Sequence, residues 1–315
     1  MARKKGGGGG RQRARQRQQY DELDKYPVMP PHAFARIVRD KQTLNIIYQI
    51  IEPPLTKKEQ EQRDEIMDIF IRSLTANIEE IDSNPEAYVR TAMDKVIKSY
   101  SMKINKKSKS KLFYYLRRDL IGYGKMDVLM NDVNVEDISL DGTNVPIFAY
   151  HRKFESVETT CVWETDEELE AYVIKLAQRC GTHISVAEPL LDATLLDGSR
   201  IVLTLGPESS TRGSAFCIRR FKDDPFSPAD IVAFRTMSSL MVAYLWIAFQ
   251  NEVPMLFVGG TASGKTTTLN AMCIFIPWQM KIVSIESTRE VNIPQPNWVP
   301  LSLIHISEPT RPALI

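Results

Sequence analysis

VGGTASGKTTTLN, residues 258–270, is the stretch that decides the fold of this chain. It matches the phosphate-loop pattern G-x-x-x-x-G-K-[ST], with the apolar run MLFV before it and a helix-forming run after it. Glycines let backbone N–H groups turn toward phosphate oxygens, and the N-terminus of the following helix favours negative charge. The stretch therefore predicts a nucleotide-binding P-loop. The alternative is a glycine-rich turn that holds no ligand.

The loop also predicts its cofactors, ATP and Mg²⁺. In such loops the lysine contacts the β- and γ-phosphates as a point charge, and the hydroxyl that follows it holds the metal. Lys265 and Thr266 occupy these two positions. The residues expected to bind the nucleotide are Gly259, Gly260, Thr261, Ala262, Ser263, Gly264, Lys265, Thr266 and Thr267.

Hydrolysis of a bound nucleotide needs carboxylates in addition to the loop. The strand-like run KIVSIE, residues 281–286, continues into STRE, and residues at the end of such a strand face the nucleotide in a P-loop sheet. Glu286 and Glu290 are the local candidates. For each of them the alternative is an exposed loop carboxylate.

Two different kinds of sequence precede residue 123. Residues 1–32 begin with a basic, low-complexity stretch and are expected to be a disordered tail. This tail is either a polybasic arm for anionic lipid or nucleic acid, or a solvated extension. Residues 33–122 have a helical pattern, and KINKKSKSK at 103–111 is interpreted as a charged connector.

Two helix starts are explicit within the helical region. Thr56 and Glu59 form the pattern of a capping box. Asn84 and Pro85 form a cap followed by proline at the first helical position. The apolar residues that follow at steps of three and four predict one buried helix face, made by Val89, Met93, Val96 and Tyr100.

Residues 123–221 predict an α+β domain with a largely antiparallel sheet. Strand-like runs surround a helix that begins after Thr165, and Asp197-Gly198 is a strong hairpin signal. Residues 222–230 are a turn-rich linker, and 231–300 begin a parallel α/β domain with a strand at 255–259 and a buried helix at 240–249. The predicted fold class is thus mixed, α/β and α+β, after a helical N-terminal region.

Composition limits the function classes. The chain has 315 residues and a formal net charge of +1, so no global field favours nucleic acid. Its four cysteines are scattered, which argues against a disulfide framework or a zinc site. The apolar run at 240–249 is about half the length that crosses a bilayer. We therefore expect the protein to act from the cytoplasmic side of any membrane.

Several motifs together resemble a known family. They cover roughly residues 110–300 and include GYGKMDVLMNDVNVEDISLDG, KLAQRCGTHISVAEPLLDATLLDGSR, GGTASGKTTTLNA and IVSIESTREVNIPQPNWVP. The chain resembles the archaeal branch of the type II/IV secretion system ATPases, which drives type IV pilus-like filaments and the archaellum. The resemblance implies a hexameric ring at the inner face of the cell membrane and a membrane platform protein as partner. It also implies a PAS-like N-terminal domain and a RecA-like C-terminal domain, with ATP between them.

The resemblance also assigns roles to individual residues. The family's acidic box normally reads I-E-D-T-R-E, and here Ser287 replaces its aspartate, which leaves Glu286 as the expected catalytic carboxylate. The family supplies arginines to the phosphates from its N-terminal domain. Arg200 and Arg219 stand at matching places. The alternative is that Arg200 and Arg219 are ordinary arginines on a strand face, with no role at the phosphates.

The family's Walker B strand and histidine box follow the acidic box, and this sequence has neither. From residue 301 on, LSLIHISEPTRPALI stops resembling the family and looks like translated read-through of a sequencing adapter. We therefore expect an N-terminal fragment that is inactive by itself, from a parent that is an ATPase. The alternatives are a DNA-transfer or helicase-like ring ATPase and a nucleotide-binding module without turnover. No basic, aromatic platform for single strands is found outside the tail, so nucleic acid is not the expected partner.

Overall fold

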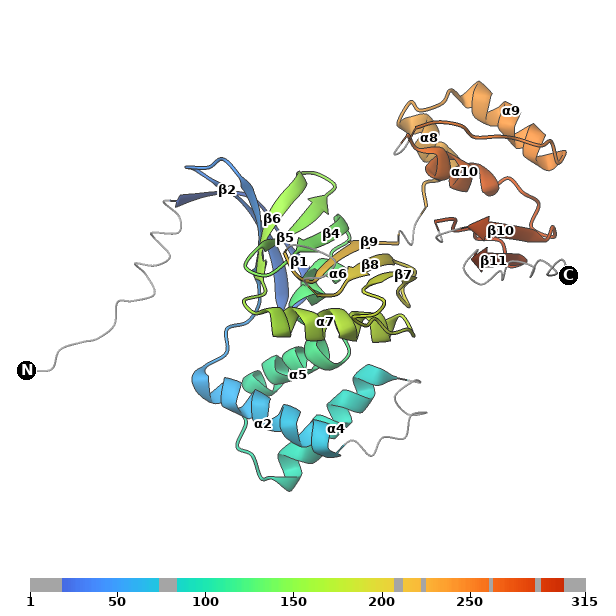
Figure 1. Cartoon of the computed structure of the whole chain (residues 1–315). Helices are drawn as coiled ribbons and strands as arrows, with labels where there is room; N and C mark the ends of the chain where they lie inside the picture. The colour runs from blue at the N-terminus through green and yellow to red at the C-terminus, as the bar shows by residue number, and fades with distance from the viewer. Residues whose placement is uncertain are drawn as a thin grey trace, which may run out of the picture. The chain divides into compact units, whose positions relative to one another are not determined.

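The computed structural model describes residues 19–73, 84–206, 212–221, 225–260, 263–286 and 290–302 (Figure 1). The chain divides into two compact units. The first comprises Met1–Lys175, Ile184–Leu190 and Leu203–Ile218, and the second comprises Leu176–His183, Leu191–Val202 and Arg219–Ile315. None of the helices in the described ranges is long and apolar enough to cross a membrane.

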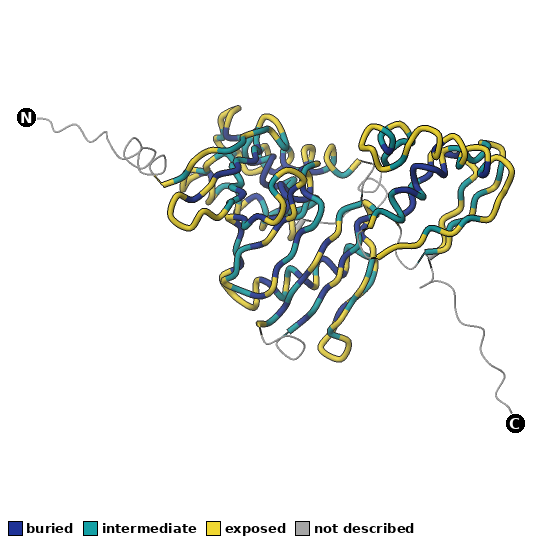
Figure 2. The backbone as a smooth tube through the Cα atoms, turned by 90° about the horizontal axis from the view of Figure 1, so that it is seen from above, coloured by how far each residue is buried: buried dark blue, intermediate teal, exposed yellow. Residues whose placement is uncertain are grey.

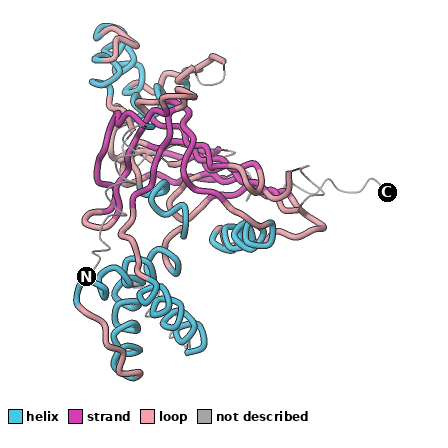
Figure 3. Tube along the Cα trace, turned by 90° about the vertical axis from the view of Figure 1, so that its left-hand side faces the viewer, coloured by secondary structure: helices cyan, strands magenta, loops and turns pink. Residues whose placement is uncertain are grey.

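The larger sheet has nine strands in the order β1-β2-β3-β6-β5-β4-β9-β8-β7. Figure 3 shows the strands of the chain in magenta and its helices in cyan, and Figure 2 shows buried positions recurring along the strands while the turns are exposed. The strands are β1 (Tyr20–Met29), β2 (Ala33–Asp40), β3 (Ile46–Ile51), β4 (Val135–Asp141), β5 (Pro146–His151), β6 (Glu155–Val162), β7 (Leu190–Thr194), β8 (Arg200–Thr204) and β9 (Ala215–Arg219).

The three N-terminal strands correct the sequence-based prediction. Residues 20–29 were expected in the disordered tail and 33–51 in a helical region, yet β1, β2 and β3 form an antiparallel series. Strand β3 then pairs in parallel with β6, where Ile47 lies opposite Glu158. Strand propensity depends strongly on the neighbouring strands. A charged strand such as β1 therefore carries little signal of its own. Residues 1–18 of the expected tail lie outside the described part.

A group of three helices lies below the sheet in Figure 1. They are α2 (Lys57–Ser73), α4 (Pro85–Ser99) and α5 (Lys106–Leu120). Both predicted helix starts are confirmed. The Thr56 N–H donates to Glu59 Oε2 at 2.8 Å, and the Asn84 side chain accepts from the Ala87 N–H at 3.1 Å. The helices enclose a core of Ile66, Phe70, Val89, Met93, Val96, Leu112 and Leu116.

Two details of this helical group were predicted wrongly. Tyr100 was expected on the buried face, but it follows the end of α4 and is 58% exposed. The segment 103–111 was interpreted as a connector, but α5 begins within it at Lys106. The Asn105 side chain caps this helix by accepting from the Ser108 N–H at 2.8 Å. The cap and the burial of Leu112 outweigh the unfavourable lysines of the first turn.

The α+β prediction for the middle of the chain is confirmed in its main features. Strands β4, β5 and β6 pair in antiparallel fashion, and η1 (Gly124–Met126) and α6 (Asp127–Asn131) precede them. The helix expected after Thr165 is α7 (Asp166–Arg179), which buries Leu169, Val173 and Leu176. The expected turn at Asp197-Gly198 is present, with φ = +85° at Gly198, a conformation that glycine adopts without strain.

The second unit contains α8 (Pro228–Ala233), α9 (Ser239–Gln250), α10 (Lys265–Cys273), β10 (Ile282–Glu286) and β11 (Trp298–Ser302). Strands β10 and β11 pair in parallel. Ile282 lies opposite Trp298 at one end of the pairing, and Glu286 lies opposite Ser302 at the other. Strand β11 thus extends past residue 300, the expected end of the P-loop domain. Packing of α8, α9 and α10 encloses a small core of Ile231, Val242, Ala271 and Met272.

Two predictions for this unit were wrong. Residues 255–259 were expected to form a strand, but the structure has no regular element there, and Leu256 is 86% exposed. An isolated extended segment gains no ladder hydrogen bonds, and β10 pairs with β11 instead. Helix α9 was expected to be buried, yet among its residues only Val242 and Ala248 are. The helix is apolar on all sides, so packing of one face leaves the others exposed.

Candidate nucleotide-binding site

The phosphate loop has the backbone geometry that its glycines predict. Gly264 directly precedes α10 and has φ = +85°, in the left-handed region. Helical bonding then begins with the Thr268 N–H donating to Gly264 O at 2.9 Å. A Cβ at Gly259 would lie 2.5 Å from Ser263 Oγ, so a side chain at this position would require the Ser263 hydroxyl to move. The left-handed conformation of Gly264 is one that glycine adopts without strain.

Lys265 lies in the first turn of α10, and its ammonium group bends back over the loop. Its Nζ donates to Gly260 O, and Ser263 Oγ donates to the same oxygen at 2.8 Å. Thr266 and Thr267 follow in the same turn and are half-buried. Thr261 and Ala262 lie outside the described residues. The loop thus gathers a cation, the hydroxyls of Ser263, Thr266 and Thr267, and the N-terminus of a helix.

Glu286 ends β10 and turns its carboxylate onto the chain that follows. Its Oε2 accepts from the Glu290 N–H at 2.8 Å and from the Val291 N–H at 2.9 Å. Its Oε1 is buried and has no hydrogen-bond partner among the described residues. Glu290, the other candidate, is exposed and contributes backbone groups to these bonds. Ser287 lies outside the described residues.

Two buried amides that lie on or against α10 were not predicted as functional. Asn270 on α10 donates from Nδ2 to Glu290 O at 3.0 Å and accepts from the Asn292 N–H at 3.1 Å. Gln295 donates from Nε2 to Cys273 O at 2.9 Å, at the other end of α10. Asn270 falls within the quoted loop motif, five residues after Lys265. A polar residue between apolar positions of a helix was the available signal.

The two candidate arginines lie on strands of the larger sheet. Arg200 begins β8, and its Nη2 and Nε donate to the Asp192 carboxylate of β7 at 2.6 and 3.1 Å. Arg219 ends β9 and is exposed. Asp192 therefore holds Arg200 in the described structure. A role of either arginine at the phosphates remains a prediction.

The residues of the loop fit ATP with Mg²⁺. Gly259, Gly260 and Gly264 carry no side chains, so a ligand meets no Cβ at these three positions of the loop. Lys265 supplies the cation and Thr266 a hydroxyl for the metal. Oε1 of Glu286, buried and without a hydrogen-bond partner among the described residues, is an acceptor that a bound water molecule would satisfy.

Comparisons with known proteins find a family whose model covers the phosphate loop. The family model described as "Type II/IV secretion system protein" matches residues 164–308, a range that runs past residue 300, where the resemblance was expected to end. Uncharacterized protein MJ0900 of Methanocaldococcus jannaschii is 34% identical over 278 residues, covering 87% of this chain and 49% of the relative. The type IV secretion system protein VirB11 of Bartonella henselae is 27% identical over 177 residues, covering 44% of this chain and 50% of the relative.

Among solved structures, the ATPase DotB of Legionella pneumophila matches with a TM-score of 0.35 and 16% identity, over 57% of this chain and 51% of that protein. The chain spans about half the length of the two curated relatives.

Proposed function

This chain belongs to the type II/IV secretion system protein family, and on that premise we propose that it is the ATP-binding part of a motor that drives export of proteins or filament subunits. The observation that carries the proposal is the phosphate loop. Gly264 in the left-handed conformation leads directly into α10, with Lys265 bent over the loop. A relative from Methanocaldococcus jannaschii fits the archaeal branch that the sequence resembles.

Within this proposal each loop residue has a stated task. Lys265 holds the β- and γ-phosphates, Thr266 holds Mg²⁺, and the N-terminus of α10 orients the phosphate chain. When bound, ATP would supply the phosphoryl group, and Mg²⁺ would neutralise part of the phosphate charge. Glu286 orients the attacking water, or accepts a proton from it, through Oε1, which has no hydrogen-bond partner among the described residues.

The assembly is proposed from the family. We infer a hexameric ring in the complete protein, acting in the cytoplasm at the inner face of the membrane beside a platform protein. The region 123–221 would then be the family's PAS-like domain, and 231–300 the beginning of its RecA-like domain. Arg200 and Arg219 would act from the first of these domains on the nucleotide bound by the second.

Lys265→Ala tests the loop assignment directly. The variant should bind a fluorescent ATP analogue with Mg²⁺ roughly tenfold or more weakly, because a hydrogen-bonded charge to the phosphates is lost. Lys281→Ala is the matched control, since Lys281 is an exposed lysine outside the loop. Equal affinity of Lys265→Ala and the original chain would refute nucleotide binding at this loop.

A further inference from the structure

One short segment, residues 290–292, is held from two sides. From β10, the Glu286 carboxylate accepts the N–H groups of Glu290 and Val291. From α10, the Asn270 side chain bonds the carbonyl of Glu290 and the N–H of Asn292. The strand that carries the candidate carboxylate and the helix that begins at Lys265 thus meet through this segment.

The two attachments alternate along the segment. Along the chain, the Glu290 N–H bonds Glu286, the Glu290 carbonyl bonds Asn270, the Val291 N–H bonds Glu286 and the Asn292 N–H bonds Asn270. Neither side chain is therefore able to shift without displacing backbone groups that bond the other. Asn270 is 8% exposed, and Val291 and Ile293 are buried in a core with Cys273. A displaced segment would leave polar groups without partners inside this packed environment, which is costly.

We propose that Asn270 is a positioning residue that couples helix α10 of the phosphate loop to the Glu286 carboxylate. The carboxamide is suited to this task because it presents one donor and one acceptor in fixed geometry. It binds a carbonyl and an N–H group two residues apart, much as a neighbouring strand would. Residues 290–292 in turn fix Oε2 of Glu286 and so set the direction of Oε1, the oxygen without a hydrogen-bond partner in the described part of the chain.

The coupling gives α10 an influence on the carboxylate. The N-terminal turn of α10 carries Lys265 and Thr266, and Asn270 lies on the same rigid helix of nine residues. A shift of the helix on phosphate binding would therefore reach Glu286 through two hydrogen bonds and one short segment. This catalytic consequence rests on the function proposed above, whereas the coupling itself is a property of the fold.

Site-resolved hydrogen exchange of this chain tests the coupling without any nucleotide. In Asn270→Leu the Asn292 amide should exchange about fivefold to tenfold faster, because its acceptor is removed. The amides of Glu290 and Val291 should also exchange faster, although they bond Glu286 and not Asn270. Acceleration confined to Asn292 would overturn the proposal. If Asn270→Leu does not fold, Asn270→Asp is used, because it removes the donor to Glu290 O and should accelerate the Glu290 and Val291 amides.

Gln295→Leu is the matched control. It removes a buried amide that bonds the C-terminal end of α10 and leaves residues 290–292 untouched. It should lower stability without accelerating exchange at Glu290 and Val291. Equal acceleration in both variants would show a general loosening of the core and would overturn the proposal.

Kinetics of the complete protein test the catalytic consequence. Asn270→Leu should lower kcat for ATP roughly tenfold and leave KM within about twofold, as expected for a group that acts after binding. Glu286→Gln should lower kcat further, and adding Asn270→Leu to it should cause no additional loss, because both act through one segment. Additive losses would overturn the role of Asn270. A failure of nucleotide binding itself would be revealed separately by Lys265→Ala.

Discussion

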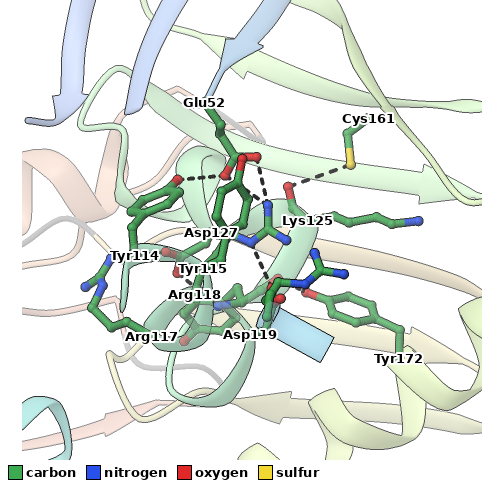
Figure 4. A network of polar contacts seen from close by, with 12 residues as sticks. Glu52, Tyr114, Tyr115, Arg117, Arg118, Asp119, Lys125, Asp127, Cys161 and Tyr172 are labelled. Atoms are coloured by element: carbon green, nitrogen blue, oxygen red, sulfur yellow. Dashed lines mark hydrogen bonds and ion pairs between the residues drawn. The ribbon is translucent and has the colours of Figure 1, made fainter. Parts of the chain in front are cut away.

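The guanidinium of Arg118 and the carboxylate of Glu52 form a largely buried ion pair between α5 and the end of β3. Arg118 Nη1 donates to both Glu52 oxygens, at 3.0 and 2.8 Å (Figure 4). The Tyr114 hydroxyl donates to the same carboxylate at 2.6 Å, and Arg118 Nε donates to Asp119 at 2.8 Å. The guanidinium also lies 4.7 Å from the centre of the Tyr115 ring. This network ties the helical group to the sheet.

Breaking this pair should destabilise the first unit strongly. In Arg118→Met the Glu52 carboxylate stays in a site where its side chain is 20% exposed, without its cation. We expect the free energy of unfolding to fall by about 3 kcal/mol, measured by urea denaturation. The control is Arg152→Met, which breaks an exposed pair with Glu136 and should cost less than about 1 kcal/mol. A similar loss of unfolding free energy in Arg118→Met and Arg152→Met would contradict the stabilising role assigned to Arg118.

Glu59 should make stability depend on pH in the acid range. Its carboxylate accepts from Ser108 Oγ at 2.6 Å and from the Thr56 N–H, and these bonds lower its pKa from 4.5 to about 2. A depressed carboxyl pKa stabilises the fold above the unfolded value and loses this contribution as pH falls toward the folded one. The contribution of Glu59 is thus complete above pH 4.5 and disappears between 4.5 and about 2.

The measurement compares urea unfolding of the original chain and Glu59→Gln at about pH 6 and about pH 3. The original chain should be the more stable at the higher pH, and the difference should shrink at the lower one. Glu61→Gln, at an exposed position of the same helix, serves as the control for the loss of one charge. A difference that is independent of pH would show that the Glu59 carboxylate is not the titrating group.

Removing Arg200 should lower ATP turnover more than breaking its ion pair with Asp192 does. If its charge stabilises the phosphates, Arg200→Ala in the complete protein should lower kcat on the order of a hundredfold. Asp192→Asn removes the partner but keeps the arginine, and should leave kcat nearly unchanged. Arg219→Ala is expected to behave like Arg200→Ala. If Arg200→Ala and Arg219→Ala leave both kcat and the melting temperature unchanged, the two arginines are ordinary strand-face residues without a role in turnover.

The exposed face of α9 should promote association. Leu240, Tyr244 and Ile247 are 82%, 73% and 63% exposed and recur at helical spacing on one side. Replacing all three by glutamine should reduce concentration-dependent light scattering without lowering the melting temperature. Val242→Gln, which places an amide in the core, should instead destabilise the unit. Unchanged scattering of the triple variant would show that another surface causes the association.

Local features of the structure were predictable from the sequence. The capping box at Thr56, the cap at Asn84 and the turn at Gly198 each depend on residues within three or four positions of one another. The phosphate loop belongs to the same class, because Gly264 and Lys265 define its conformation together with the helix that follows. The motif order also indicated the family.

Tertiary structure alone decided the features that join distant segments. The bond between Arg118 and Glu52 spans 66 positions, and the pairing of β3 with β6 brings Ile47 opposite Glu158. Asn270 lies 20 positions before Glu290 and 22 before Asn292. A strand or a buried amide is stabilised by partners whose identity depends on the folded chain, so no local pattern specifies them. The sequence by itself determined the turn at Gly264 that leads into α10 and the starts of α2 and α4, and the packing of remote segments determined which residues support them.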